Sequence, residues 1–295
     1  MKKNKDIKLK VALTPAGAVW NVLKAIIYVF MFLCAISFIL SFIWILVNSF
    51  KTAPDYMEDV FMPAGTFDWE NYVQVLQNLN YRGYGLFGML GNSLILVGWN
   101  VLMAMTLPHM AAYVLARFDF KFGRFLESVV FISMVIPVVG GASSTMWFLN
   151  STGLYDNFLG LFILQAVGLG FSQIMLTNFY RGVSATYAEA AYIDGASEWM
   201  VFIKIYYPQA KAITLITVVN TVIGVWNDYM TGYLYLPNHP TLALGLQQMQ
   251  AQFVDFGNDY PIMFAGVILS MIPVLILYFT FSKQIIENMS VGAMK

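Results

Sequence analysis

The chain has 295 residues, of which 59% are hydrophobic and only 11% are charged, and its formal net charge is zero. Soluble domains carry about 25% charged residues, because their surface must be hydrated. The composition therefore excludes an ordinary soluble protein, and the balanced charge gives no reason to expect a nucleic-acid partner.

Six stretches with no formal charge, or with a single ionisable side chain, are each long enough to cross a bilayer, which takes about 20 residues of helix. The second contains His109 and the fifth contains Asp228. We expect an all-α integral membrane protein with six transmembrane helices, within residues 25–50, 83–116, 128–155, 157–180, 212–235 and 260–282.

The distribution of Lys and Arg predicts the orientation. With the N-terminus inside, the outer loops hold only Lys51 and Arg82, and Lys24 lies at the inner end of the first span. Positive charge concentrates on the cytoplasmic side of multi-pass proteins, so both termini are expected in the cytoplasm. The other thirteen of the sixteen basic residues then lie inside: Lys2, Lys3, Lys5, Lys8, Lys10, Arg117, Lys121, Arg124, Arg181, Lys204, Lys211, Lys283 and Lys295.

The basic tail, residues 1–17, precedes an apolar stretch that is longer than the about 7–15 apolar residues of a signal peptide. We therefore expect an uncleaved anchor. Cys34 is the only cysteine, and His109 and His239 are the only histidines. No metal site is expected from so few dispersed ligands. Neither a Walker loop nor a nucleophile elbow is present, so we expect no catalytic residues.

On the outer side, residues 67–76 alternate aromatic, acidic and apolar residues in a way that predicts a short amphipathic helix on the membrane surface. Residues 236–259, the last outer loop, contain Pro237 and Pro240.

The inner loop, about residues 182–211, is far longer than a turn requires, and such loops usually have a function. Thr186 and Glu189 fit a capping box that starts a helix, and Gly195 permits a sharp reversal. Ser197 is expected to cap a second helix from Glu198 to about Tyr206, which Pro208 would end. The sequence predicts a helix–turn–helix beneath the membrane.

The same loop carries Glu189-Ala190-Ala191, then Gly195, Ile205 and Pro208. This spacing resembles the EAA motif in the membrane subunits of bacterial ABC importers. The family usually has Leu before the final Pro, where this chain has Tyr207. The resemblance implies a coupling helix that docks on the ATPase subunit through Glu189, Ala190, Ala191, Asp194 and Gly195.

Further matches are similar to the MalG-like permeases of carbohydrate ABC importers. In that group, the segment Thr241-Leu242-Ala243-Leu244-Gly245 belongs to an outer loop that reaches into the sugar cleft of the binding protein, and the C-terminal tail contacts the ATPase. The other matching segments are Asn92-Ser93-Leu94, residues 111–118, Pro137, Trp226-Asn227-Asp228-Tyr229 and Gly292-Ala293-Met294-Lys295.

The resemblance implies a type I importer permease, with a permease domain over residues 18–295, in the bacterial cytoplasmic membrane. Its implied partners are a second permease, two ATPase subunits that hold ATP and Mg, an extracytoplasmic solute-binding protein, membrane lipid and a carbohydrate, such as an oligosaccharide or derivatised sugar. The chain itself is expected to bind no cofactor.

Two interpretations of Asp228 stay open. With Trp226, Asn227 and Tyr229 it could line the translocation path, since ionisable groups at membrane depth tend to face a cavity or partner. Alternatively, it lies hydrated at the outer interface, with Trp226 and Tyr229 in an aromatic belt. For His109 we favour a packed or interfacial role over a proton relay.

Three other functions compete with a sugar importer. An ABC importer for a non-sugar solute would carry the same inner loop. An ion-coupled secondary transporter needs an ionisable relay, for which only Asp228, His109 and Glu127 are available. A non-transporting sensor or scaffold would leave the inner loop without a role.

Overall fold

The computed structural model describes residues 15–61, 65, 67–136, 140–166, 170–251 and 259–292, with backbone alone at residues 15–18 and 281–292. Pro137, the tail residues 1–14 and the last three residues, 293–295, lie outside the described residues. Within these ranges the regular secondary structure is helical apart from one two-stranded hairpin, β1 (Asn80–Tyr81) and β2 (Tyr84–Gly85).

Three described helices are long and apolar enough to cross a membrane: α2 (Pro15–Asn48), α5 (Leu86–Arg117) and α16 (Tyr260–Gly292). A helix suits a bilayer because it satisfies its own backbone hydrogen bonds. A fourth candidate is the pair of segments Glu198–Gln209 and Lys211–Asn227, which are bent by 74°. The expected all-α membrane fold is confirmed, whereas the count of six spans stays a prediction.

The expected third, fourth and fifth spans are each divided into two shorter helices. They correspond to α6 (Gly123–Val135) with α7 (Gly141–Ser151), α8 (Phe158–Gln165) with α9 (Phe171–Gly182), and α13 (Lys211–Asn227) with α14 (Tyr229–Tyr235).

The chain separates into two compact units, and the first contains residues 1–71 and 259–268. In it, the Asn71 amide donates to the carbonyls of Ser49 and Lys51, at 3.0 and 2.8 Å. Lys51 is buried, and its ammonium donates to the carbonyl of Asp59 at 2.6 Å. Most apolar side chains of α2 are exposed, which suits a helix surrounded by lipid or by another membrane subunit.

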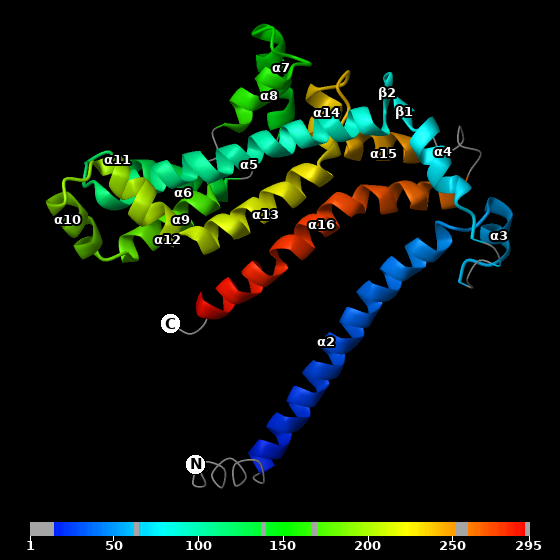
Figure 1. Cartoon of the computed structure of the whole chain (residues 1–295), viewed down its shortest axis with the longest axis horizontal. Coiled ribbons are helices and arrows are strands. Elements are labelled where there is room, and N and C mark those ends of the chain that lie inside the picture. The colour runs from blue at the N-terminus through cyan, green and yellow to red at the C-terminus, as the bar shows by residue number, and fades with distance from the viewer. Residues whose placement is uncertain are drawn as a thin grey trace. The chain divides into compact units, whose positions relative to one another are not determined.

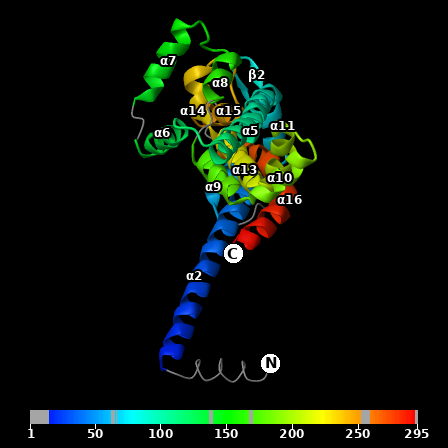
Figure 2. The same ribbon diagram turned by 90° about the vertical axis from the view of Figure 1, so that its left-hand side faces the viewer.

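The second unit contains residues 72–258 and 269–295 and is organised around α5. This helix packs along both α9 and α13 (Figure 1). Viewed from the side, α7 stands away from these three helices (Figure 2). α5 therefore forms the centre of the packed part of this unit.

The expected short amphipathic helix is present as α4 (Glu70–Asn78), preceded in the chain by the short α3 (Ala53–Glu58), and its position on the outer side stays a prediction. Val75 and the following Leu79 are fully or almost fully buried, whereas Val73 and Leu76 are exposed. The hairpin after α4 turns through Arg82 and Gly83, both with positive φ, as a two-residue turn of the primed type requires.

Candidate functional site

The first helix of the inner loop, α10 (Ala185–Ile193), is capped by Ser184 and not by Thr186. The Ser184 hydroxyl accepts a hydrogen bond from the backbone N–H of Thr186, at 3.4 Å. The predicted capping box of Thr186 and Glu189 is therefore wrong, because the helix starts one residue before Thr186. Glu189 is exposed and is left available for another role.

The turn after α10 has the expected form. Gly195 has φ +81°, a conformation that residues with a Cβ rarely adopt. The backbone N–H of Ala196 returns to the carbonyl of Ala191 at 2.9 Å. Ser197 then caps α11 (Glu198–Val201) by accepting from the N–H of Met200, at 3.4 Å. The predicted helix–turn–helix is confirmed.

Pro208 does not end the second helix. A π-helical turn, η1 (Phe202–Tyr206), carries the chain from α11 into α12 (Tyr207–Gln209), which includes the proline. Proline lacks the N–H that a helix residue normally donates. The π-turn just before it changes which carbonyls are paired, so the helix continues through Pro208. The bend to α13 follows at Ala210.

The inner loop rests on a buried cluster that it shares with α5 and α9. Ala188 of α10 is fully buried, and the second half of the loop contributes Val201, Phe202 and Tyr206. The ring of Tyr113 lies 4.9 Å from that of Phe202 and 5.1 Å from that of Tyr206. The other buried members are Ala112, Leu176, Tyr180 and Ala210. Sequence reasoning missed Ala188, because a single small residue gives no signal of burial.

Hydrogen bonds between polar side chains also join α10 and α11 of the inner loop to α5. The Glu198 carboxylate accepts hydrogen bonds from two tyrosines, Tyr113 of α5 at 2.9 Å and Tyr192 of α10 at 2.6 Å. Partial burial, and then the hydrogen bond to Glu198, raise the pKa of the Tyr192 hydroxyl above its ordinary value. The phenol therefore stays a hydrogen-bond donor at physiological pH.

One helical turn before Tyr113, His109 is fully buried between α9 and α13. Its Nδ1 lies 2.7 Å from the Tyr180 hydroxyl, and its Nε2 lies 3.0 Å from that of Thr214. The Thr214 hydroxyl also donates to the carbonyl of Ala210 at 3.0 Å, so a neutral ring can donate from Nε2 and accept at Nδ1. His109 is thus a packed residue, as expected.

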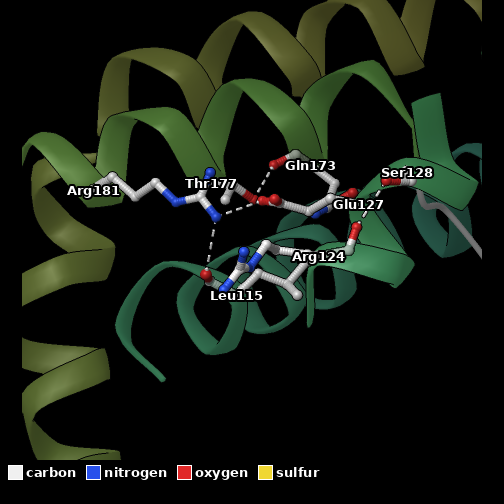
Figure 3. A network of polar contacts seen from close by, with 7 residues as sticks. All are labelled: Leu115, Arg124, Glu127, Ser128, Gln173, Thr177 and Arg181. Atoms are coloured by element: carbon white, nitrogen blue, oxygen red, sulfur yellow. Dashed lines mark hydrogen bonds and ion pairs between the residues drawn. The ribbon is translucent and has the colours of Figure 1, made fainter. Parts of the chain in front are cut away.

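Arg181, at the end of α9, connects two further elements (Figure 3). Its guanidinium pairs with the carboxylate of Glu127 in α6 at 2.8 Å, and donates to the carbonyl of Leu115 in α5 at 3.3 Å. The pair is partly exposed, and such pairs contribute about 1 kcal/mol or less. It orients the chain at the entrance to the inner loop more than it stabilises the fold.

The residues expected to dock on an ATPase lie in the second half of α10 and in the turn that follows. Glu189, Ala190, Asp194 and Gly195 are exposed, and Ala191 is half-buried. Next to Asp194, the side chain of Ile193 is 87% exposed. The surface is therefore accessible, and it includes one exposed apolar side chain and two exposed carboxylates.

The four residues expected to line a path differ in their burial and in their partners. Trp226 is 7% exposed, and its indole N–H donates to the carbonyl of Ser270 in α16 at 3.1 Å. Asp228 lies between α13 and α14 and caps α14, accepting from the N–H of Thr231 at 3.0 Å and from its hydroxyl at 2.5 Å. Asn227 and Tyr229 are exposed. A path role for this group stays a prediction.

Most of the segment expected to contact a binding protein, residues 241–245, lies in a helix. Leu242 begins α15 (Leu242–Ala251), and Thr241, Leu242, Leu244 and Gly245 are buried. A Cβ on Gly245 would collide with the Met89 sulfur of α5. The connection between α14 and α16 thus contains a helix that covers residues 242–245, and contact of residues 241–245 with a binding protein stays a prediction.

Two residues near the start of α5 fasten this segment. The Asn92 amide donates to the carbonyl of Pro240 at 2.9 Å, and the Ser93 hydroxyl accepts from the N–H of Leu242 at 2.8 Å. At the other outer connection, Asp156 accepts from the backbone and side-chain amides of Asn238, at 3.0 and 2.8 Å.

The chain resembles curated membrane proteins over most of its length. It is 27% identical to the diacetylchitobiose uptake system permease protein NgcG of Streptomyces coelicolor, over 92% of this chain and 89% of that one. It is 26% identical to the trehalose/maltose transport system permease protein MalG of Thermococcus litoralis, over 93% and 98%. It is 24% identical to the melibiose/raffinose/stachyose import permease protein MelC of Bacillus subtilis, over 85% and 89%.

A similar fold occurs in a bacterial ABC transporter that imports the acidic polysaccharide alginate. One of its chains matches with a TM-score of 0.75 and 20% identity, over 92% of this chain and 98% of that one. The model of the family "Binding-protein-dependent transport system inner membrane component" matches residues 104–290, which include α9 to α15 and the inner loop. The chain belongs to this family of inner membrane components of binding-protein-dependent transport systems.

Proposed function

We propose that this chain is one permease subunit of an ATP-driven importer for a carbohydrate, an oligosaccharide or a derivatised sugar. It supplies half of the translocation path and one docking loop, and contains no catalytic residues of its own. A second permease, two ATPase subunits that bind ATP and Mg, and an extracytoplasmic binding protein complete the assembly.

The observation that carries this proposal is the architecture of the inner loop. Its exposed end presents Glu189, Asp194 and Gly195, while its buried side is packed against α5 and α9. A surface that is accessible on one side and fixed on the other suits the transfer of movement from a partner. The sugar class is supported by the relatives in Streptomyces, Thermococcus and Bacillus, which are named as permeases for diacetylchitobiose, trehalose/maltose and melibiose/raffinose/stachyose.

The binding-protein partner is supported by a second alginate transporter structure, solved with an alginate pentasaccharide-bound periplasmic protein. Its matching chain has a TM-score of 0.62 and 16% identity, over 90% of this chain and 97% of that one.

An ion-coupled secondary transporter is less well supported. Each candidate for its relay already has a partner: Glu127 pairs with Arg181, Asp228 caps α14, and His109 lies between two hydroxyls. Unpaired acids that face a cavity would suit such a relay better.

The test is the ATPase activity of the complex reconstituted with its encoded partners, measured with binding protein loaded with different oligosaccharides. Stimulation by one loaded form, and not by the empty protein, is expected and identifies the solute. A complex that responds only to a non-sugar solute would keep the importer proposal but contradict the sugar as its substrate. Failure to recruit an ATPase would contradict it.

A docking variant sharpens this test. Glu189→Arg should abolish co-purification of the ATPase, whereas Asp119→Arg, at an exposed carboxylate in the inner turn between α5 and α6, should leave it intact. Equal behaviour of the two variants would argue against docking through α10.

A further inference from the structure

The inner loop is joined to its neighbouring helices in sequence through two breaks in the helical backbone. Between α9 and α10 the chain leaves helical geometry at Val183 and Ser184. At its other end, α12 and α13 meet at Ala210 with a bend of 74° between the flanking segments. A push on α10 that travelled along the backbone alone would be partly absorbed at these breaks, because a hinge rotates where a continuous helix would move.

A side-chain bridge avoids both breaks. Glu198 accepts from Tyr192 of α10 with one carboxylate oxygen and from Tyr113 of α5 with the other. Tyr113 is 85 residues away in sequence, and it is 5% exposed. Both bonds join a phenol to a carboxylate, which makes them stronger than bonds between neutral groups.

The end of the bridge away from α10 is Tyr113, which lies on α5, the helix that contacts most of its neighbours in this unit. α5 runs unbroken from Leu86 to Arg117 and packs along α9 and α13. One turn from Tyr113, His109 contacts Tyr180 of α9 and Thr214 of α13. A displacement of Tyr113 is therefore delivered to three helices together.

We propose that Glu198 is a positioning residue that clamps the docking helix α10 to α5 through Tyr192 and Tyr113, so that ATPase movement reaches α5 directly. This proposal rests on the proposed function. The carboxylate itself need not contact the ATPase: Tyr113 and Tyr192 occupy both of its oxygens. Its effect should appear in the coupling between ATP hydrolysis and transport, not in assembly.

The experiment compares Glu198→Ala, Glu198→Gln, Tyr113→Phe and Tyr192→Phe in the reconstituted complex. Asp119→Ala is the control for an exposed inner carboxylate, and Tyr233→Phe, in α14, is the control for an exposed tyrosine. Four quantities are measured: ATPase co-purification, thermal stability, stimulation of ATP hydrolysis by loaded binding protein, and sugar uptake per ATP hydrolysed.

We expect Glu198→Ala and Tyr113→Phe to assemble with the ATPase while sugar uptake per ATP falls about tenfold, the value of one charge-assisted hydrogen bond. In Glu198→Gln, which keeps the length of the side chain, sugar uptake per ATP should fall less. The Tyr113→Phe/Glu198→Ala double variant should be no worse than Glu198→Ala, because both changes remove the same contact.

The clamp is contradicted if Glu198→Gln and Tyr113→Phe both assemble and keep wild-type uptake per ATP, or if the two effects multiply in the double variant. It is also contradicted if stability falls while uptake per ATP does not, since that result indicates a purely structural contact. A wild-type complex that hydrolyses ATP without any response to loaded binding protein would instead contradict the proposed function, and the clamp with it.

Discussion

The two ends of α5 hold their neighbours in different ways. Near its inner end, His109 and Tyr113 bond to other side chains, those of Tyr180, Thr214 and Glu198. Near its outer end, Asn92 and Ser93 bond to the backbone of the segment that leads into α15. The inner bonds join α5 to three separate helices, α9, α13 and α11, whereas the outer bonds hold only the segment that enters α15. The inner end is therefore the better candidate for transmitting movement.

The largest expected effect is at the inner end. His109→Leu removes a buried partner of Tyr180 and Thr214 and should destabilise the complex by about 2–3 kcal/mol, because a buried hydroxyl is left unpaired. His239→Leu is the control, since His239 is only half-buried and contacts the Tyr84 hydroxyl at 3.2 Å. Thermal unfolding in detergent measures both, and a larger loss for His239→Leu would reverse the comparison.

The outer end of α5 also contacts α15 through close packing, because Gly245 of α15 lies against the side chain of Met89. Gly245→Ala places a Cβ against the Met89 sulfur and should cost about 1–3 kcal/mol through overpacking. Gly224→Ala, in α13, meets no neighbour within 4 Å and should stabilise the helix by about 0.5–1 kcal/mol. Stability measurements that give both variants the same sign would show that α15 is not packed as described.

The hydrogen bonds from α5 to the backbone before α15 should contribute less to stability than the packing at Gly245. Asn92→Ala leaves the carbonyl of Pro240 without this donor and is expected to cost about 1–2 kcal/mol. Asn150→Ala removes only a bond to Met146 within the same helix and should change stability by about 0.5 kcal/mol or less. If Asn92→Ala lowers uptake per ATP without lowering stability, then the outer end also transmits movement.

Asp228 allows a test of its two interpretations. Asp228→Asn should keep the cap of α14 and the wild-type stability, whereas Asp228→Ala should lose about 1 kcal/mol. Unchanged uptake and unchanged sugar preference in Asp228→Asn would remove the path interpretation. Altered preference at unchanged stability would support it, and would add a solute contact to the outer half of the chain.

The smallest expected effect concerns pH in the first unit. Burial, and then the nearby Asp68, raise the pKa of Asp259 above its ordinary value, although the N–H of Ile262 opposes the shift. A raised pKa in the folded state means that stability is gained as pH falls through that value and is lost as pH rises through it. Asp259→Asn should therefore stabilise slightly at neutral pH and flatten this dependence, as thermal unfolding at several pH values would reveal.

Local features could be predicted from the sequence because they depend on neighbouring residues. Gly195 and Ser197 take the turn and cap positions that their side chains favour. The choice of Thr186 over Ser184 failed because two hydroxyl residues two positions apart are both good caps. The prolines around residues 237–240 indicated a loop, yet they precede a helix that is held by contacts with α5.

Contacts between distant residues could not be predicted. Tyr113 and Glu198 are separated by 85 residues, and neither carries a pattern that indicates the other. The same holds for Ala188, whose burial follows from the cluster that α5 and α9 complete. For His109 the general expectation of packing was correct, but its two hydroxyl partners depend on how three helices meet.

The most direct test of the central claim is uptake of the identified oligosaccharide into proteoliposomes that contain the whole complex. We predict accumulation only with ATP and Mg on the ATPase side and loaded binding protein on the other, with no effect of collapsing proton and sodium gradients. Uptake that persists without ATP and follows an ion gradient would contradict the importer account.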